Sequence, residues 1–67
     1  MTAEDEVMRR AMAAAEERLA AREHDVQERL HALADRFPDP QQAHDSASAL
    51  SARADRHLAR AEELRGA

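Results

Sequence analysis

The sequence predicts an all-α protein, an antiparallel two-helix hairpin that self-associates into a four-helix bundle. First, the composition favours helix, because 17 of the 67 residues are alanine and the chain holds one glycine, two prolines and one aromatic residue. Second, Pro38 and Pro40 lie together near the middle, where they separate two long stretches without helix breakers. Third, apolar residues recur at helical spacing in both stretches.

The first helix is expected over about residues 3–36. Thr2 offers a hydroxyl at the N-cap position, and the acidic residues that follow it lie in the first turn, where the helix dipole favours negative charge. Pro38 disfavours the α conformation at Phe37 and therefore ends the helix. Residues 37–39 are the expected turn of one helical-hairpin domain that covers residues 1–67.

The second helix is expected over about residues 40–65. Asp39 is placed to cap it, Pro40 suits the first helical position, and Gln42 follows the cap by three residues, as in a capping box. Gly66 is placed to stop the helix as the residue after its C-cap.

Each expected helix carries a seven-residue repeat of apolar positions, as in a coiled coil. Folding the chain at the turn sets the two repeats against each other, with Leu30 opposite Leu50 and Val26 opposite Ala54. The expected interface residues of the hairpin and its oligomer are Val7, Met8, Met12, Leu19, Val26, Leu30, Leu33, Phe37, Leu50, Ala54, His57, Leu58, Ala61 and Leu64.

A lone hairpin of this size has too small a core. Ordering a chain costs roughly 1.5 kcal/mol per residue, and a seam made largely of alanine buries too little surface to offset that cost. The first helix is also the longer one, so Val7, Met8 and Met12 extend past the second helix and lack a partner within one hairpin. We therefore expect a homo-oligomer, most simply a two-fold dimer.

One polar layer interrupts the expected seam. His57 occupies a repeat position of the second helix, at the level where Arg22 and Glu23 straddle a missing apolar position of the first. A buried imidazole needs hydrogen-bond partners, which these two side chains can provide or deny. We interpret the layer as a polar contact that sets the register of the helices, with a pH-sensitive switch as the alternative.

The stretch REHDVQERLH holds the candidate metal ligands His24, Glu28 and His31. Their spacing places them on one side of a helix, and imidazole and carboxylate groups bind zinc and related ions. At 100° per residue, they point about 140–200° away from Val26 and the expected seam. We therefore interpret them as a solvated face and expect no catalytic, cofactor or metal site, with an interface site for zinc or nickel as the alternative.

The charge pattern bounds the possible partners. The net charge is −4, and the ten basic residues, all arginine, are interspersed with fourteen acidic ones, so nucleic-acid binding is not expected.

The chain has no cysteine, which excludes disulfides and thiolate metal sites. No apolar run reaches the length of a signal-peptide core or a membrane span, so we expect a cytoplasmic protein without a membrane partner. The alanine- and arginine-rich composition indicates a GC-rich bacterial genome.

These features together predict a non-enzymatic interaction module, a small regulatory or assembly protein that pairs with itself and can bind another protein. The overall plan, a short acidic helical hairpin that pairs into a bundle, resembles that of the plasmid copy-number regulator Rop. The resemblance extends over the whole chain as architecture, and no motif matches residue by residue. Two alternatives stay open from sequence: a metal-binding helical bundle with histidine and glutamate ligands, and a Rop-like RNA-binding regulator.

Overall fold

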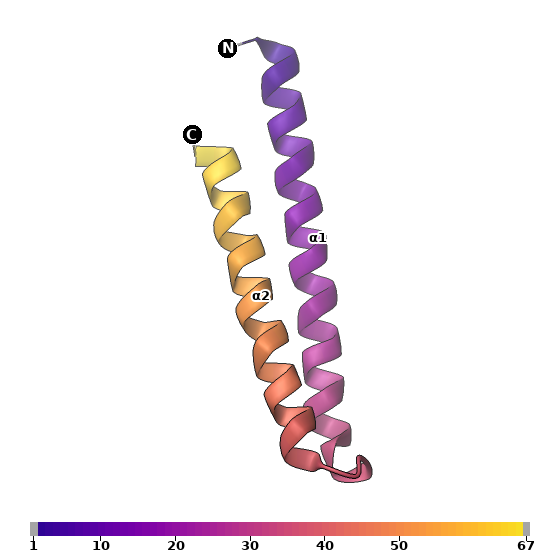
Figure 1. The fold of residues 1–67 in the computed structure, drawn as a ribbon. Coiled ribbons are helices and arrows are strands. Elements are labelled where there is room, and N and C mark those ends of the chain that lie inside the picture. The colour runs from indigo at the N-terminus through magenta and orange to yellow at the C-terminus, as the bar shows by residue number, and fades with distance from the viewer. Residues whose placement is uncertain (1, 67) are drawn as a thin grey trace.

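The computed structural model describes residues 2–66 and shows two long helices packed side by side (Figure 1). Helix α1 spans Ala3–Leu33, a short 3-10 helix η1 spans Ala34–Arg36, and helix α2 spans Pro40–Gly66. The molecule measures 53 × 13 × 11 Å along its principal axes. Residues 2–66 contain no strand, and the predicted all-α hairpin is confirmed.

Helix α1 begins with a complete capping box. The Thr2 hydroxyl accepts the Asp5 backbone N–H at 3.2 Å, and the Asp5 carboxylate accepts the Thr2 backbone N–H at 3.3 Å. At the other end, the α-helix stops at Leu33 and tightens into η1, because Phe37 adopts the extended backbone that the following proline requires. The helical stretch therefore reaches residue 36 as predicted, with its last turn in 3-10 geometry.

Helix α2 begins where the sequence predicts it. The Asp39 carboxylate accepts the Gln42 backbone N–H at 3.2 Å, and the Asp39 carbonyl accepts the Ala43 N–H at 3.3 Å. At its other end the helix includes Gly66, whose φ is not positive. The predicted glycine stop is therefore not formed.

The buried core of the hairpin consists of alanine. No side chain larger than alanine is fully buried within residues 2–66. Because an alanine projects only a methyl group, two alanine faces let their helix backbones approach closely. The buried residues are Ala13, Ala20 and Ala34 from the first half of the chain and Ala43, Ala47, Ala54 and Ala61 from α2.

The face that α1 turns toward α2 differs from the expected one. The alanines that α1 and η1 bury recur at seven-residue intervals together with half-buried Gln27. Each member of this repeat directly follows a large apolar residue of the expected seam: Met12–Ala13, Leu19–Ala20, Val26–Gln27 and Leu33–Ala34. One residue corresponds to a rotation of about 100°, so α2 packs about 100° around α1 from the large apolar side chains. Helix α2 itself uses a seven-residue repeat as expected, since its four buried alanines follow one another at steps of 4, 7 and 7 residues.

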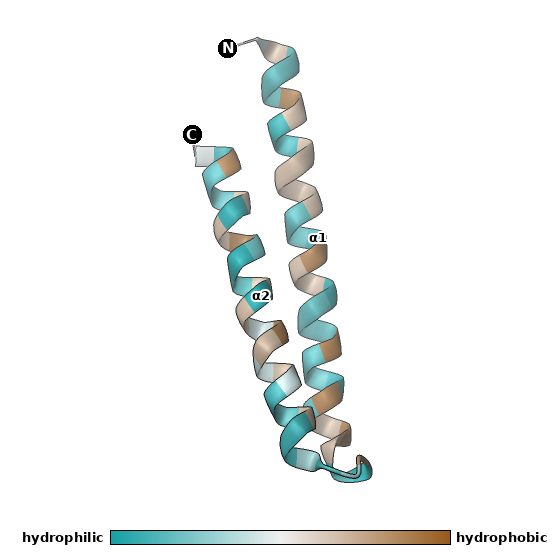
Figure 2. Ribbon diagram, viewed as in Figure 1, coloured by the Kyte–Doolittle hydropathy of each residue, from teal (hydrophilic) through white to brown (hydrophobic). Residues whose placement is uncertain are grey.

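Hydrophobic bands alternate with hydrophilic ones along both helices (Figure 2). Within residues 2–66, neither helix combines the length and the apolar character that crossing a membrane requires.

Candidate interaction surface

Six large apolar side chains of α1 and the turn form a line that α2 leaves uncovered, which we call the apolar stripe. Met8 exposes 64% of its surface, and the other five each expose 41–43%. At 100° per residue, the five that lie in α1 point within about 40° of one direction, and Phe37 follows them in the turn. A line of exposed apolar side chains on one helix face is typical of a contact surface. The stripe consists of Met8, Met12, Leu19, Val26, Leu33 and Phe37.

The stripe continues onto an overhang at the open end of the hairpin. Helix α1 extends past the end of α2 there (Figure 1). On this overhang Val7 exposes 65% of its surface. Val7 and Met8 line an apolar hollow of about 400 Å³ that α1 forms alone. Val7 and Met8 are therefore exposed within one hairpin, as predicted.

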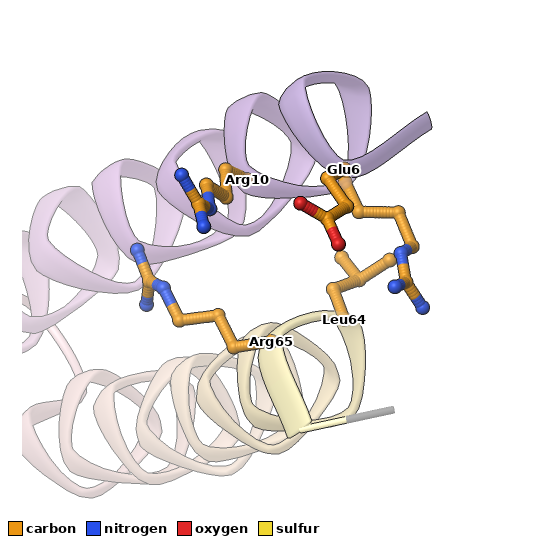
Figure 3. A pocket seen from close by; sticks show the side chains of 5 residues that line it. Glu6, Arg10, Leu64 and Arg65 are labelled. Carbon is orange, nitrogen blue, oxygen red and sulfur yellow. The ribbon is translucent and has the colours of Figure 1, made fainter. Parts of the chain in front are cut away.

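Beside the overhang, α1 and the last turn of α2 enclose an open groove of about 360 Å³ (Figure 3). Glu6 and Arg10 project into it from α1, while Leu64 and Arg65 project from α2 on the other side. Arg9 also lines it. Acidic groups accompany these arginines, since Glu6 lies in the groove and Arg65 forms an ion pair with Glu17. The groove therefore has a mixed charge.

A polar layer crosses the alanine seam near its middle. The His57 Nδ1 atom contacts the Glu16 carboxylate, and its Nε2 atom lies 3.1 Å from Glu23 Oε1. Arg60 Nε lies 3.5 Å from Glu16 Oε1. The side chains of His57, Glu16 and Glu23 are 27%, 19% and 13% exposed, so the layer is largely removed from solvent. The contact of His57 with Glu23 agrees with the predicted level of these two residues, whereas Arg22, the other residue of the predicted layer, is exposed.

Glu16 is the member of this layer that sequence reasoning missed. It precedes Glu23 by seven residues, so the two carboxylates share one repeat position on successive heptads. His57 lies between them with a ring nitrogen toward each. A neutral imidazole donates one hydrogen bond, while an imidazolium donates two. Glu23 Oε2 is buried and has no hydrogen-bond partner within residues 2–66.

The layer lies on one particular side of the seam. Measured from Val26, Glu23 and Glu16 point at about 60° and 80°, and the direction toward α2 is about 110°. The polar layer therefore borders the apolar stripe, between the stripe and α2. In this layer one imidazole of α2 contacts two carboxylates of α1, so it joins the two helices at one level of the seam.

The structure does not bring the candidate metal ligands together. His24 Nδ1 lies 3.0 Å from Gln27 Oε1, while His31 Nδ1 lies 2.7 Å from Nδ1 of His44 on α2. Glu28 is exposed. In the described part of the chain, no three histidine, cysteine, aspartate or glutamate side chains gather closely enough to hold a metal ion.

Comparison with known proteins adds no relative: no protein-family model, curated protein or solved structure matches this chain. The fold and its surface define the class as a helical hairpin with an alanine core and one uncovered apolar helix face.

Proposed function

We propose that this protein is a non-enzymatic interaction module whose apolar stripe binds a second copy of the chain, so that two hairpins form a four-helix bundle. The position of the stripe carries this proposal. In a four-helix bundle each helix packs against two neighbours, in directions roughly 90° apart. Helix α1 has one such direction occupied by α2, and the stripe marks a second direction about 100° away.

The surface area of the hairpin supports a second copy as the partner. The chain exposes 5051 Å². A folded monomer of 7.5 kDa exposes about 4,250 Å² by the usual scaling of surface with mass. The excess of about 800 Å² equals what each partner loses in an interface of standard size. A second copy packed on the stripe would bury an area of this order.

A second copy also provides the core that one hairpin lacks. Each buried alanine removes only one methyl group from water, and a buried CH₂ or methyl group contributes about 0.8 kcal/mol. Six of the eleven large apolar side chains within residues 2–66 lie instead on the stripe, where each exposes 41–64% of its surface. Stripe-to-stripe packing gathers six such side chains from each copy into one interior, as in a bundle core.

The spacing of the stripe fits antiparallel pairing of the two α1 helices. From Met8 to Phe37 the steps are 4, 7, 7, 7 and 4 residues, the same in both directions. Antiparallel pairing therefore sets Met8 level with Phe37 of the second copy, and Leu19 level with Val26. The gap in the repeat at residues 22–23 then meets the same gap. A stripe with its gap elsewhere would set large side chains against polar ones.

Bundle geometry supports the same orientation. A two-fold axis perpendicular to α1 leaves both α2 helices on one side of the α1 pair, and the four helices then enclose a common interior. Parallel pairing about an axis along the helices places the two α2 helices on opposite sides. In the antiparallel bundle, the layer of His57 and Glu23 from each copy approaches the two-fold axis. Polar residues at such positions specify register and partner.

We assign this module a regulatory or assembly role, in which the paired hairpins present their outer faces and overhanging first turns to another protein. Two features argue against catalysis and RNA binding. Both ring nitrogens of His57 face carboxylates, and the arginines of the overhang groove are accompanied by Glu6 and Glu17. RNA binding needs clustered positive charge or stacking aromatic side chains.

Sedimentation equilibrium over a wide range of protein concentrations tests the proposal. We expect a particle of twice 7.5 kDa that dissociates on dilution, with helix content falling as the dimer dissociates. A fully helical monomer at the highest concentration would refute the proposal, because the hairpin would then be stable with its apolar stripe exposed to water.

A further inference from the structure

We propose that His31 and His44 form a two-histidine clamp that binds one late first-row transition-metal ion, such as Zn²⁺ or Ni²⁺, across the closed end of the hairpin. The two Nδ1 atoms lie 2.7 Å apart, one from each helix. Their ring centroids are 5.0 Å apart and the planes are inclined by 29°, so the rings meet edge to edge with the two nitrogens facing each other. The clamp is distinct from the sequence-predicted group, which lay along α1 alone.

The spacing of the two nitrogens is close to that of two ligands of one ion. Imidazole nitrogens bind zinc at about 2.0–2.1 Å, so two of them at angles of 90–109° are about 2.9–3.4 Å apart. The His31 and His44 nitrogens need to separate by only a few tenths of an ångström to reach this range. The two Nδ1 atoms now face each other directly, so each ring must also turn by about 35–45° to direct its lone pair at one ion. Rotation about the side-chain bonds provides this movement, because His31 is exposed and His44 only half-buried.

The contact also has the chemistry of a ligand pair. When two Nδ1 atoms meet without a metal, one must donate its proton and the other must accept, so the rings need opposite tautomers. A metal ion removes this requirement, since both nitrogens then offer their lone pairs to the ion and both Nε2–H groups point elsewhere. Imidazole suits Zn²⁺, Ni²⁺ and Cu²⁺, whereas Mg²⁺ prefers oxygen ligands. Water molecules fill the remaining coordination positions.

The hairpin holds both histidines near its turn. His31 lies in the last turn of α1, where its carbonyl accepts the Ala34 backbone N–H. His44 lies in the second turn of α2, close to the cap formed by Asp39. The ligands are thus brought together only when both helices are formed and paired. An ion that binds the folded hairpin and not the unfolded chain raises the melting temperature.

The clamp lies away from the apolar stripe. At 100° per residue, His31 points about 140° from Val26, beyond the direction of α2. The inference therefore does not depend on the proposed pairing of two hairpins, and one ion per chain is expected in monomer and dimer alike. Half an ion per chain would instead indicate a site shared between copies and would overturn the clamp.

Thermal unfolding of the metal-depleted full chain with and without ZnCl₂, NiCl₂ or MgCl₂ tests the clamp. We expect Zn²⁺ and Ni²⁺ to raise the melting temperature and Mg²⁺ to leave it unchanged. His31→Gln and His44→Gln should each abolish the rise. His24→Gln is the matched control and should keep it, because His24 lies one heptad earlier on the same face and contacts Gln27.

Isothermal titration of the same variants measures the stoichiometry. One ion per chain in the wild type and in His24→Gln, with none in either clamp variant, supports the proposal. It is overturned if the wild type shows no rise at millimolar Zn²⁺ or Ni²⁺. It is also overturned if the rise persists in both clamp variants, because an adventitious ion elsewhere would then explain it.

Discussion

Replacing Leu19 by alanine should weaken the dimer without unfolding the hairpin. Leu19 is 41% exposed in the single hairpin. Complete burial of a leucine side chain contributes about 1.5–3 kcal/mol, so the part still exposed accounts for about 1 kcal/mol per copy. Two copies give about 2 kcal/mol per dimer, which corresponds to an increase in the dissociation constant of about thirtyfold.

Leu58→Ala is a matched control for this change. Leu58 has nearly the same exposure, 39%, and loses the same atoms. It lies on the other side of the seam, however, in a groove that it shares with Glu17 and His24. We therefore expect Leu58→Ala to leave the dissociation constant within a few-fold of the wild type.

Sedimentation equilibrium of the wild type and both variants gives the three dissociation constants, and circular dichroism checks that each remains helical. Equal weakening by Leu19→Ala and Leu58→Ala would refute the reasoning, because the effect would then follow from general loss of apolar surface. Weakening by Leu58→Ala alone would place the interface on the wrong face of the hairpin.

Three further predictions concern the hairpin itself. Asp39→Ala removes the carboxylate that caps α2 and should lower the free energy of unfolding by about 1 kcal/mol; an unchanged urea midpoint would show that the cap is not needed. Ala54→Leu forces extra methylene groups between two closely packed backbones and should cost about 1–3 kcal/mol, and an equal or higher melting temperature would contradict the close packing. His57→Ala and Glu23→Ala should be non-additive by about 0.5–3 kcal/mol in a double-mutant cycle, whereas His57→Ala and Arg22→Ala should be additive.

The ends of the helices could be predicted from sequence because local chemistry determines them. Thr2 and Asp39 cap backbone N–H groups within three residues along the chain, and Pro38 acts on the residue before it. The side of α2 that faces α1 could also be predicted, since the alanine repeat is the main regular apolar pattern in that helix.

The facing side of α1 was mispredicted because α1 carries two repeats offset by one residue. One holds the large apolar residues such as Leu19 and Val26, and the other holds Ala20 and Gln27. Because larger apolar side chains bury more surface, the first repeat was expected to form the core. The alanine seam of α2 packs closely only against small side chains, however, so the second repeat faces it and the large residues remain for another partner.

Contacts between the helices were the least predictable part of the site. The ring contact of His31 with His44 and the contact of Glu16 with His57 join residues 13 and 41 positions apart. The predicted metal group, by contrast, lies along one helix, where spacing in the sequence alone defines which side chains are neighbours. Contacts across the hairpin depend on the rotation of α1, and that rotation was the feature that the sequence did not determine.

Disulfide trapping tests the pairing of the stripes most directly, because the natural chain has no cysteine. Leu19→Cys and Val26→Cys proteins are mixed in equal amounts and oxidised, with Leu58→Cys as the control. We predict that the mixed Leu19→Cys/Val26→Cys disulfide predominates. In the antiparallel bundle, like positions lie seven residues, or about 10 Å, apart along the axis, beyond the Cα separation of about 4.4–6.8 Å that a disulfide spans. Self-disulfides of Leu19→Cys alone would contradict the antiparallel order, and yields no higher than those of Leu58→Cys would contradict pairing through the stripe.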